Sequence, residues 1–142
     1  MAAGTALDAA EVQALLDAAR AARGRAHAPY SRFQVGAAVL DEQGRIHAGC
    51  NVENAAYPQG LCAEAGALAA MVLAGGRQAR ALAVVGPGPG WTTPCGGCRQ
   101  KLREFAADDV PVLIADGQGV QARFTLGELL PHAFGPDHLG PG

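Results

Sequence analysis

Three cysteines and one glutamate have the residue types and the spacing of a metal site that carries out acid–base chemistry. Cys62 precedes Glu64 by two residues in "LCAE", and Cys95 and Cys98 form a C-x-x-C pair in "TTPCGGCRQ". Both groups lie where an irregular segment becomes a predicted helix. A helix N-terminus lowers the pKa of a thiol and favours the metal-binding thiolate. Three thiolates leave one position of a tetrahedral zinc ion open, which is typical of catalytic zinc.

Glu64 would give such a site a proton carrier, because it stands near the start of an otherwise apolar segment, "LCAEAGALAAMVLAG". A carboxylate beside a zinc-activated water can take the water's proton and pass it to a substrate. The parts also have other interpretations. A C-x-x-C pair is typical of a redox couple, and a lone cysteine such as Cys50 is more often a small buried hydrophobe. Redox chemistry explains neither a third cysteine nor its acidic neighbour, so the combination favours catalytic zinc.

The elements that would position these residues alternate between helix and strand. Apolar residues recur at helical spacing from Leu7 to Ala19. Thr5 or Asp8 is suited to cap this helix, and Gly24 to end it. The other predicted elements, in chain order, are a two-stranded hairpin over 33–52 that turns at 41–44, a helix over 61–75, a strand that begins at 81, a helix over 94–106, a strand over 110–116, and a short strand and a short helix within 122–134.

This order of elements predicts an α/β fold. Strands that alternate with helices pair in parallel, whereas the early hairpin is antiparallel, so the sheet should be mixed. We expect a three-layer α/β/α sandwich with a mixed sheet of about five strands. We expect one domain over residues 1–142, because 142 residues are too few for two ordinary domains.

Composition and charge limit the kinds of partner. Hydrophobic residues make up 49% of the chain, charged residues make up 17%, and the formal net charge is -2. The first two values are those of a globular protein, and the third argues against a protein that grips the phosphates of nucleic acids. The sequence also lacks an apolar run of membrane-spanning length and the pattern of a secretory signal. We therefore expect a cytoplasmic protein that acts on a small molecule, with no nucleic-acid and no membrane partner.

Three strings of the sequence closely resemble the small, three-cysteine cytidine deaminases that act on free nucleosides: "APYSRFQVGAAV", "NVENAAYPQGLCAE" and "TTPCGGCRQ". The similarity is specific from Tyr30 to Cys98 and looser as far as Phe134. It implies a cytidine-deaminase-like fold. It also implies hydrolytic deamination of cytidine and deoxycytidine to uridine and deoxyuridine, with release of ammonia, as in pyrimidine salvage.

The same resemblance implies one zinc ion per subunit, held by Cys62, Cys95 and Cys98. Glu64 would be the catalytic residue. It would take a proton from the activated water, deliver it to N3 of the pyrimidine, and help protonate the departing amine.

Further positions are implied to contact the substrate. Asn51 and Glu53 correspond to residues that hydrogen-bond the ribose 3'-hydroxyl, and Phe33 to the aromatic residue that packs against the pyrimidine. Taken alone, Asn51 could equally cap a strand end, Glu53 could be an exposed charge, and Phe33 could be a core residue of a strand. The backbone N–H of Ala63 and the carbonyl of Thr93 correspond to groups that read the base edge.

The resemblance also bears on assembly. Phe134 resembles a C-terminal aromatic residue that enters a neighbouring subunit's site in the homotetrameric members, which implies a homotetramer with shared active sites. Phe134 could instead simply anchor the last helix. One position departs from the pattern, because Ala65 stands where many members have an arginine that hydrogen-bonds the zinc thiolates. Helix N-terminal amides or Arg99 are candidates to offset the thiolate charge instead.

Two other functions stay open from the residues. The protein could deaminate a different aminated ring, although Asn51 and Glu53 favour a ribosyl group. It could also be a non-enzymatic zinc protein or a thiol redox protein, which zinc stoichiometry and free-thiol counts would distinguish.

Overall fold

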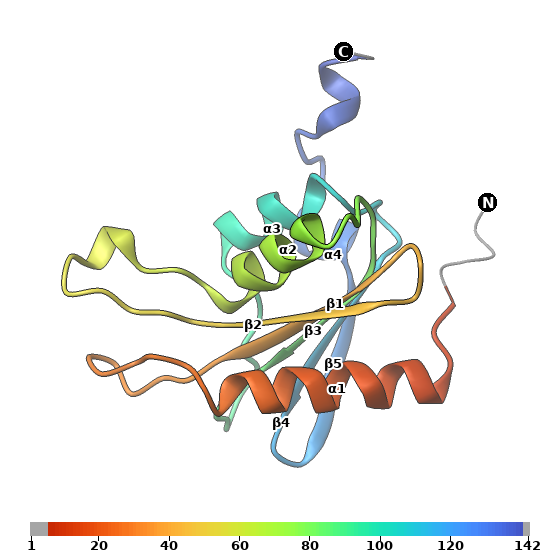
Figure 1. The fold of residues 1–142 in the computed structure, drawn as a ribbon. Coiled ribbons are helices and arrows are strands. Elements are labelled where there is room, and N and C mark those ends of the chain that lie inside the picture. Colours follow the sequence, from red (N-terminus) through yellow and green to blue (C-terminus); the bar gives the residue numbers. More distant parts are fainter. Residues whose placement is uncertain (1–5, 141–142) are drawn as a thin grey trace.

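The computed structural model describes residues 6–140 (Figure 1). Helices and strands alternate along most of the chain, as the sequence predicts. The elements are α1 (Ala9–Arg23), β1 (Gly36–Asp41), β2 (Ile46–Cys50), the 3-10 turn η2 (Tyr57–Gln59), α2 (Ala63–Leu73), β3 (Ala79–Val85), α3 (Gly96–Arg103), β4 (Pro111–Asp116), β5 (Gly119–Thr125), α4 (Leu126–Leu129) and η3 (Pro136–His138). None of the helices in this described part is long and apolar enough to cross a membrane.

The five strands form one sheet in the order β2-β1-β3-β4-β5. The pair β3/β4 is parallel, and the pairs β1/β2, β1/β3 and β4/β5 are antiparallel. Helix α1 covers one face of this sheet, and α2, α3 and α4 cover the other (Figure 1). The predicted three-layer α/β/α sandwich with a mixed sheet is therefore confirmed.

The central strands are buried on both faces, so they read as continuous apolar runs instead of alternating ones. In β1, Ala38 and Leu40 join the core under α1, while Ala37 and Val39 join the core under α2. All six residues of this strand are buried. Helix α1 contributes its narrow apolar stripe to the first core, consistent with its predicted amphipathic pattern.

Helix α1 begins with a capping box between Asp8 and Glu11 and ends at Gly24. Asp8 is thus the N-cap of the two candidates, and Thr5 lies outside the described residues. The hairpin is shorter than predicted at both ends, because β1 begins at Gly36 and not at residue 33, and β2 ends at Cys50 and not at residue 52.

Helix α2 lies unusually close to the sheet where it crosses β2. A Cβ atom on Gly49 would lie 2.4 Å from the backbone nitrogen of Ala67 and 2.6 Å from the carbonyl oxygen of Ala63. Only glycine permits this approach. Ala63 is the first residue of α2, and the candidate site lies at this end of the helix. The contact with Gly49 therefore fixes how far the N-terminal end of α2 lies from the sheet.

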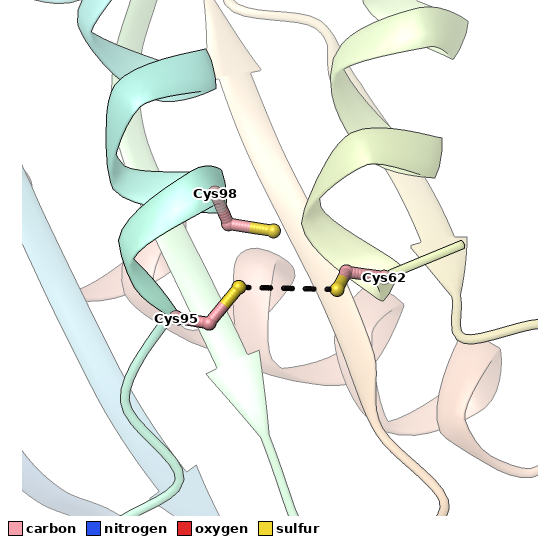
Figure 2. A group of neighbouring side chains, drawn as sticks. All are labelled: Cys62, Cys95 and Cys98. Carbon is pink, nitrogen blue, oxygen red and sulfur yellow. Dashed lines mark hydrogen bonds between the residues drawn. The ribbon is translucent and has the colours of Figure 1, made fainter. Parts of the chain in front are cut away.

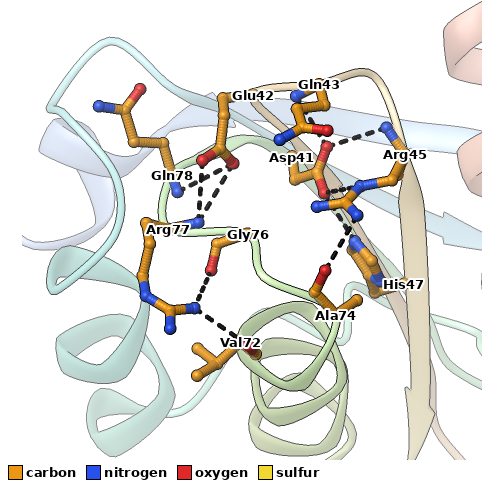
Figure 3. Close-up of polar contacts among 10 residues, drawn as sticks. All are labelled: Asp41, Glu42, Gln43, Arg45, His47, Val72, Ala74, Gly76, Arg77 and Gln78. Carbon is orange, nitrogen blue, oxygen red and sulfur yellow. Dashed lines mark hydrogen bonds and ion pairs between the residues drawn. The ribbon is translucent and has the colours of Figure 1, made fainter.

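The opposite end of α2 is held by a polar cluster around the β1–β2 turn (Figure 3). Asp41 is fully buried, forms an ion pair with Arg45 and lies 2.8 Å from Nε2 of His47. Arg45 also donates a hydrogen bond of 2.9 Å to the carbonyl of Ala74, just after the last residue of α2. This contact satisfies one of the carbonyls that a helix C-terminus leaves without an internal partner.

Candidate metal centre and substrate site

Two helix N-termini bring three cysteines together, as Figure 2 shows. Cys62 is the N-cap of α2, Cys95 is the N-cap of α3, and Cys98 lies in the first turn of α3. The three sulfur atoms lie within 4.8 Å of one another, and those of Cys62 and Cys95 are 4.0 Å apart. Zn–S bonds of about 2.3 Å in a tetrahedron separate the ligand sulfurs by about 3.8 Å. The donor set therefore fits one zinc ion with a fourth position left for a water or substrate atom.

The environment of the three thiols differs. Burial raises the pKa of Cys62 and of Cys98, and the charge of Glu64 raises the Cys98 value further. The backbone N–H of Cys98 lowers the pKa of Cys95, more strongly than burial raises it. All four cysteines, including the half-buried Cys50, are free thiols. The sulfurs of Cys62 and Cys95 are 4.0 Å apart and therefore form no disulfide, which needs about 2.05 Å. A third sulfur lies within 4.8 Å of both, and a redox pair does not need it, so the cluster favours a metal site.

Glu64 lies in the first turn of α2 and is 5% exposed. Burial raises the pKa of this carboxyl, although its own backbone N–H and the charge of Lys101 oppose the shift. In the described chain the other buried carboxylate is Asp41, which contacts Arg45 and His47, whereas Glu64 forms no ion pair there. A buried carboxyl of raised pKa beside three thiols is suited to take up and release a proton.

A second group of candidate residues surrounds the segment that precedes β1. The Asn51 side chain accepts a hydrogen bond of 2.9 Å from the backbone N–H of Val35 and donates one of 2.8 Å to the carbonyl of Phe33. The side chain thus takes the Val35 N–H and the Phe33 carbonyl that a longer strand would pair, and only the bond from the Asn51 N–H to the Val35 carbonyl (3.2 Å) continues the pairing before Gly36. This explains the late start of β1. The amide keeps one unused N–H for a ligand. Phe33 is not a core strand residue, because it precedes the strand and is 45% exposed.

Glu53 is not a free surface charge. Its carboxylate accepts hydrogen bonds from the backbone N–H groups of Tyr30 (2.9 Å) and Ser31 (3.1 Å) and from the Ser31 hydroxyl. The hydrogen bond from the Ser31 hydroxyl lowers the pKa of Glu53, and the two backbone N–H groups lower it further. Burial raises this pKa but does not outweigh the hydrogen bonds. The prediction from sequence did not include Ser31. The signal available for it was its position two residues before Phe33 in the "APYSRFQVGAAV" string.

Main-chain pairing joins this second group to the cysteines. Val52, between Asn51 and Glu53, exchanges two backbone hydrogen bonds of 2.9 and 2.8 Å with Leu61, the residue before Cys62. The candidate sugar-binding residues are therefore attached directly to the start of the helix that carries Cys62 and Glu64.

The two backbone groups expected to read a base are free of other partners in the described chain. Ala63 is the first residue of α2, where N–H groups have no partner within the helix. Thr93 lies two residues before Cys95, and no described N–H donates to its carbonyl. Arg99 holds this loop: it donates to the Pro94 carbonyl (2.6 Å) and the Thr93 hydroxyl (3.3 Å).

Arg99 does not offset the thiolate charge by direct contact. Its third guanidinium bond, of 2.8 Å, goes to the Leu129 carbonyl at the end of α4, so its hydrogen-bonding groups are directed at carbonyl and hydroxyl oxygens and not at sulfur. The amides at the start of α2 and α3 are the remaining candidates to compensate for Ala65, since both helices point their N-termini at the cysteines (Figure 2).

The chain after α4 projects away from the body of the molecule (Figure 1). Phe134 in this segment is 57% exposed and stacks on His138 with ring centroids 5.0 Å apart. Gln100 and Arg103 of α3 hold the segment through bonds of 2.9 Å to the Phe134 carbonyl and 3.0 Å to Asp137. Phe134 therefore does not anchor a helix against the core.

Trp91 lies edge to face on Phe124 of β5, with ring centroids 5.6 Å apart. It remains 60% exposed, so it covers the sheet edge and does not fill the core.

Comparison with known proteins places this arrangement in a family. Residues 9–114 match the family described as the cytidine and deoxycytidylate deaminase zinc-binding region. The chain is 43% identical over 129 residues to a cytidine deaminase of Sporosarcina psychrophila, covering 91% of this chain and 95% of that protein. It is 46% identical over 123 residues to a cytidine deaminase of Mycobacterium tuberculosis, covering 87% of this chain and 88% of that one.

Solved structures agree with these relatives. A cytidine deaminase from Burkholderia pseudomallei superposes with a TM-score of 0.80 at 45% identity, covering 86% of this chain and 98% of that chain. The crystal structure of cytidine deaminase from Mycobacterium tuberculosis gives a TM-score of 0.75 at 42% identity, covering 87% and 96% of the two chains. With its three clustered cysteines and its buried glutamate, the chain belongs to the cytidine and deoxycytidylate deaminase family.

Proposed function

We propose that this protein is a zinc-dependent cytidine deaminase that converts cytidine and deoxycytidine to uridine and deoxyuridine. The observation that carries the proposal is the placement of Glu64, buried and of raised pKa, on the same helix start as one of three sulfurs that fit a single zinc ion. The names of the relatives support the nucleoside, because those that match most of this chain are cytidine deaminases.

Cys62, Cys95 and Cys98 would hold the zinc ion, one per subunit, and the ion would supply an activated water at its open position. Glu64 takes a proton from the water and passes it to N3 of the pyrimidine while the water oxygen bonds to C4. Glu64 then carries the second water proton to the exocyclic amine, the C4–N bond breaks, and ammonia leaves as the C4 carbonyl forms. The sum is cytidine plus water giving uridine plus ammonia.

The substrate contacts follow from the groups left free at the site. The unused N–H of Asn51 and the fixed carboxylate of Glu53 supply one donor and one acceptor, which together orient a sugar hydroxyl. The exposed ring of Phe33 is available to pack against the base. The unpaired N–H of Ala63 and carbonyl of Thr93 are available to read its polar edge.

The assembly is proposed to be a homotetramer in which Phe134 contributes to a neighbouring subunit's site. Support comes from its exposed ring and from the projecting segment that carries it. The whole chain, residues 1–142, would form one domain, and the protein would work in the cytoplasm in pyrimidine salvage. Neither nucleic acid nor a membrane is expected as a partner, since the net charge is only -2.

The test is the ultraviolet spectrum of cytidine over time with purified, zinc-loaded protein and with Glu64→Gln as the matched variant. We expect the cytidine band to disappear with the wild type, and turnover to fall by at least about a thousandfold in the variant, because the proton carrier is lost. The variant should keep one zinc per chain, which separates loss of chemistry from loss of the metal.

Free cytosine beside cytidine tests the sugar contacts, and cytidine should be strongly preferred. A zinc-loaded wild type that leaves cytidine and deoxycytidine unchanged would refute the proposal. Equal activity of the wild type and Glu64→Gln would refute the role of Glu64.

A further inference from the structure

The segment before β1 and the segment after β2 meet at a surface cavity of about 390 Å³. A volume of this size suits a small ligand. Main-chain bonds join the two segments: the N–H of His27 donates to the Asn51 carbonyl (3.0 Å), and the N–H of Glu53 donates to the His27 carbonyl (2.7 Å). The cavity is lined by Tyr30, Ser31, Glu53, Asn54, Tyr57 and Gly60.

Ser31, the only serine of the chain, has two hydrogen-bond partners at this cavity. The backbone N–H of Phe33 lies 2.9 Å from the Ser31 hydroxyl oxygen, and the Glu53 carboxylate lies on its other side. An N–H can only donate and a carboxylate can only accept, so both directions follow. The hydroxyl accepts from Phe33 and donates to Glu53, and one side chain thereby connects two residues that are 20 positions apart in the sequence.

In the described chain the Ser31 hydroxyl is the one hydrogen-bond partner of the second carboxylate oxygen of Glu53 and of the Phe33 N–H. One oxygen of Glu53 takes the N–H groups of Tyr30 and Ser31, while the other takes the Ser31 hydroxyl. The backbone of Phe33 is held at its carbonyl by Asn51 (2.8 Å) and at its N–H by Ser31. Removing the hydroxyl would free one carboxylate oxygen and release one end of Phe33 together.

We propose that Ser31 is a positioning residue for nucleoside binding, whose hydroxyl fixes the Glu53 carboxylate toward a sugar hydroxyl and holds the backbone of Phe33 beside the base. The inference rests on the proposed deaminase function. Because Ser31 acts through residues that bind the substrate and not through Glu64, its loss should weaken binding and leave the chemical step nearly intact. The size of the change in KM should also depend on whether the substrate carries the sugar hydroxyl that donates a hydrogen bond to Glu53.

The experiment measures KM and kcat for cytidine and for 3'-deoxycytidine with the wild type, Ser31→Ala and Ser31→Thr. For Ser31→Ala we expect KM for cytidine to rise about tenfold, the size of one hydrogen bond to a charged group, with kcat within about twofold. With 3'-deoxycytidine the same substitution should raise KM by less than about threefold, because the partner of Glu53 is already missing and only the smaller effect through the Phe33 backbone remains. Ser31→Thr keeps the hydroxyl and should restore the wild-type KM to within about twofold.

Equal increases in KM for the two substrates would overturn the proposal, and so would an unchanged KM. If Ser31 had a purely structural role, Ser31→Ala would lower the melting temperature and kcat. Its effect on KM would then be the same for the two substrates, and Ser31→Thr would not bring the KM for cytidine back to the wild-type value. If Ser31→Ala does not fold, Ser31→Cys, with a weaker donor, should show the same substrate dependence at smaller size. Failure of the proposed function is a separate result: the wild type would then not deaminate cytidine at all.

Discussion

Replacing Asp41 by asparagine is expected to destabilise the protein without changing its chemistry. Four hydrogen bonds converge on this fully buried carboxylate. One oxygen accepts the backbone N–H groups of Gln43 and Arg45, both at 2.9 Å, and the other accepts the Arg45 side chain at 2.9 Å and contacts His47 Nε2 at 2.8 Å. Asparagine keeps one acceptor oxygen but places an NH₂ donor where Arg45 donates (Figure 3).

The size of the effect follows from this environment. Removing one partner of a buried ion pair costs about 3–5 kcal/mol. The lower end applies here, because the Arg45 side chain is 39% exposed and water can partly replace its partner. About 3 kcal/mol corresponds to a fall in melting temperature of roughly 10 °C for a chain of this length.

The assay is thermal unfolding at fixed protein concentration, with Glu42→Gln as the matched control. Glu42 is the neighbouring, exposed carboxylate, which accepts the backbone N–H groups of Arg77 (3.0 Å) and Gln78 (3.3 Å). Glutamine retains an acceptor there, so the melting temperature should fall by at most about 3 °C. The kcat of both variants should equal that of the wild type at 25 °C, because Ala74, which the cluster holds, lies ten residues and about 15 Å along α2 from Glu64.

The dependence on pH supplies a second readout. Burial alone would raise the pKa of Asp41, but hydrogen bonds from His47, Arg45 and Gln43 outweigh it and lower the pKa from 3.8 to about 2. A carboxylate whose pKa is lower in the folded state stabilises the fold above its unfolded-state pKa and loses that contribution as the pH falls through its folded-state pKa. The gap between the wild type and Asp41→Asn should therefore be constant above about pH 4 and narrow between about pH 4 and pH 2. A gap of less than 3 °C at neutral pH, or one unchanged down to pH 2, would contradict the stabilising role of the Asp41 carboxylate.

Three further predictions concern the site. Gly49→Ala should lower both the melting temperature and kcat, because its Cβ would lie 2.4 Å from the Ala67 nitrogen and push α2, which carries Glu64, away from the sheet. Gly24→Ala is the control and should match the wild type, because its Cβ would meet only the Ala21 carbonyl oxygen, at 3.6 Å. Removal of the metal with a chelator should abolish turnover and lower the melting temperature, and added zinc but not calcium should restore both. Truncation after Pro131, which removes Phe134, should abolish activity with zinc content unchanged, and activity retained in that variant would exclude a shared site.

Much of the architecture could be predicted from local patterns. The periodicity of α1, the hairpin that turns after Asp41 and the buried strand over 110–116 all agree with the structure. The start of β1 could not be predicted in this way, because it depends on the side-chain amide of Asn51. This amide bonds the Phe33 carbonyl and the Val35 N–H, which a longer strand would pair with its neighbour. A side chain that competes for backbone partners from 16 positions away leaves no trace in the hydrophobic pattern of the strand.

The candidate site divides in the same way. The types and spacing of Cys62, Glu64, Cys95 and Cys98 already indicated catalytic zinc, since the required chemistry is a property of the side chains themselves. The partners of Arg99 were not predictable, because its long side chain can reach several loops, and only the packed structure selects the Leu129 carbonyl over a nearby sulfur.

Residue type and periodicity are local properties, so the chemistry available to this protein and the order of its helices and strands could be read from the chain before it was folded. Which of those groups meet depends on the packing of the folded molecule. The sheet sets α2 and α3 side by side, so that cysteines 33 residues apart in the sequence have sulfurs 4.0 Å apart. It also brings Ser31 to Glu53, a contact between two surface segments. Such contacts depend on the register and packing of segments distant in the chain, which local sequence does not specify.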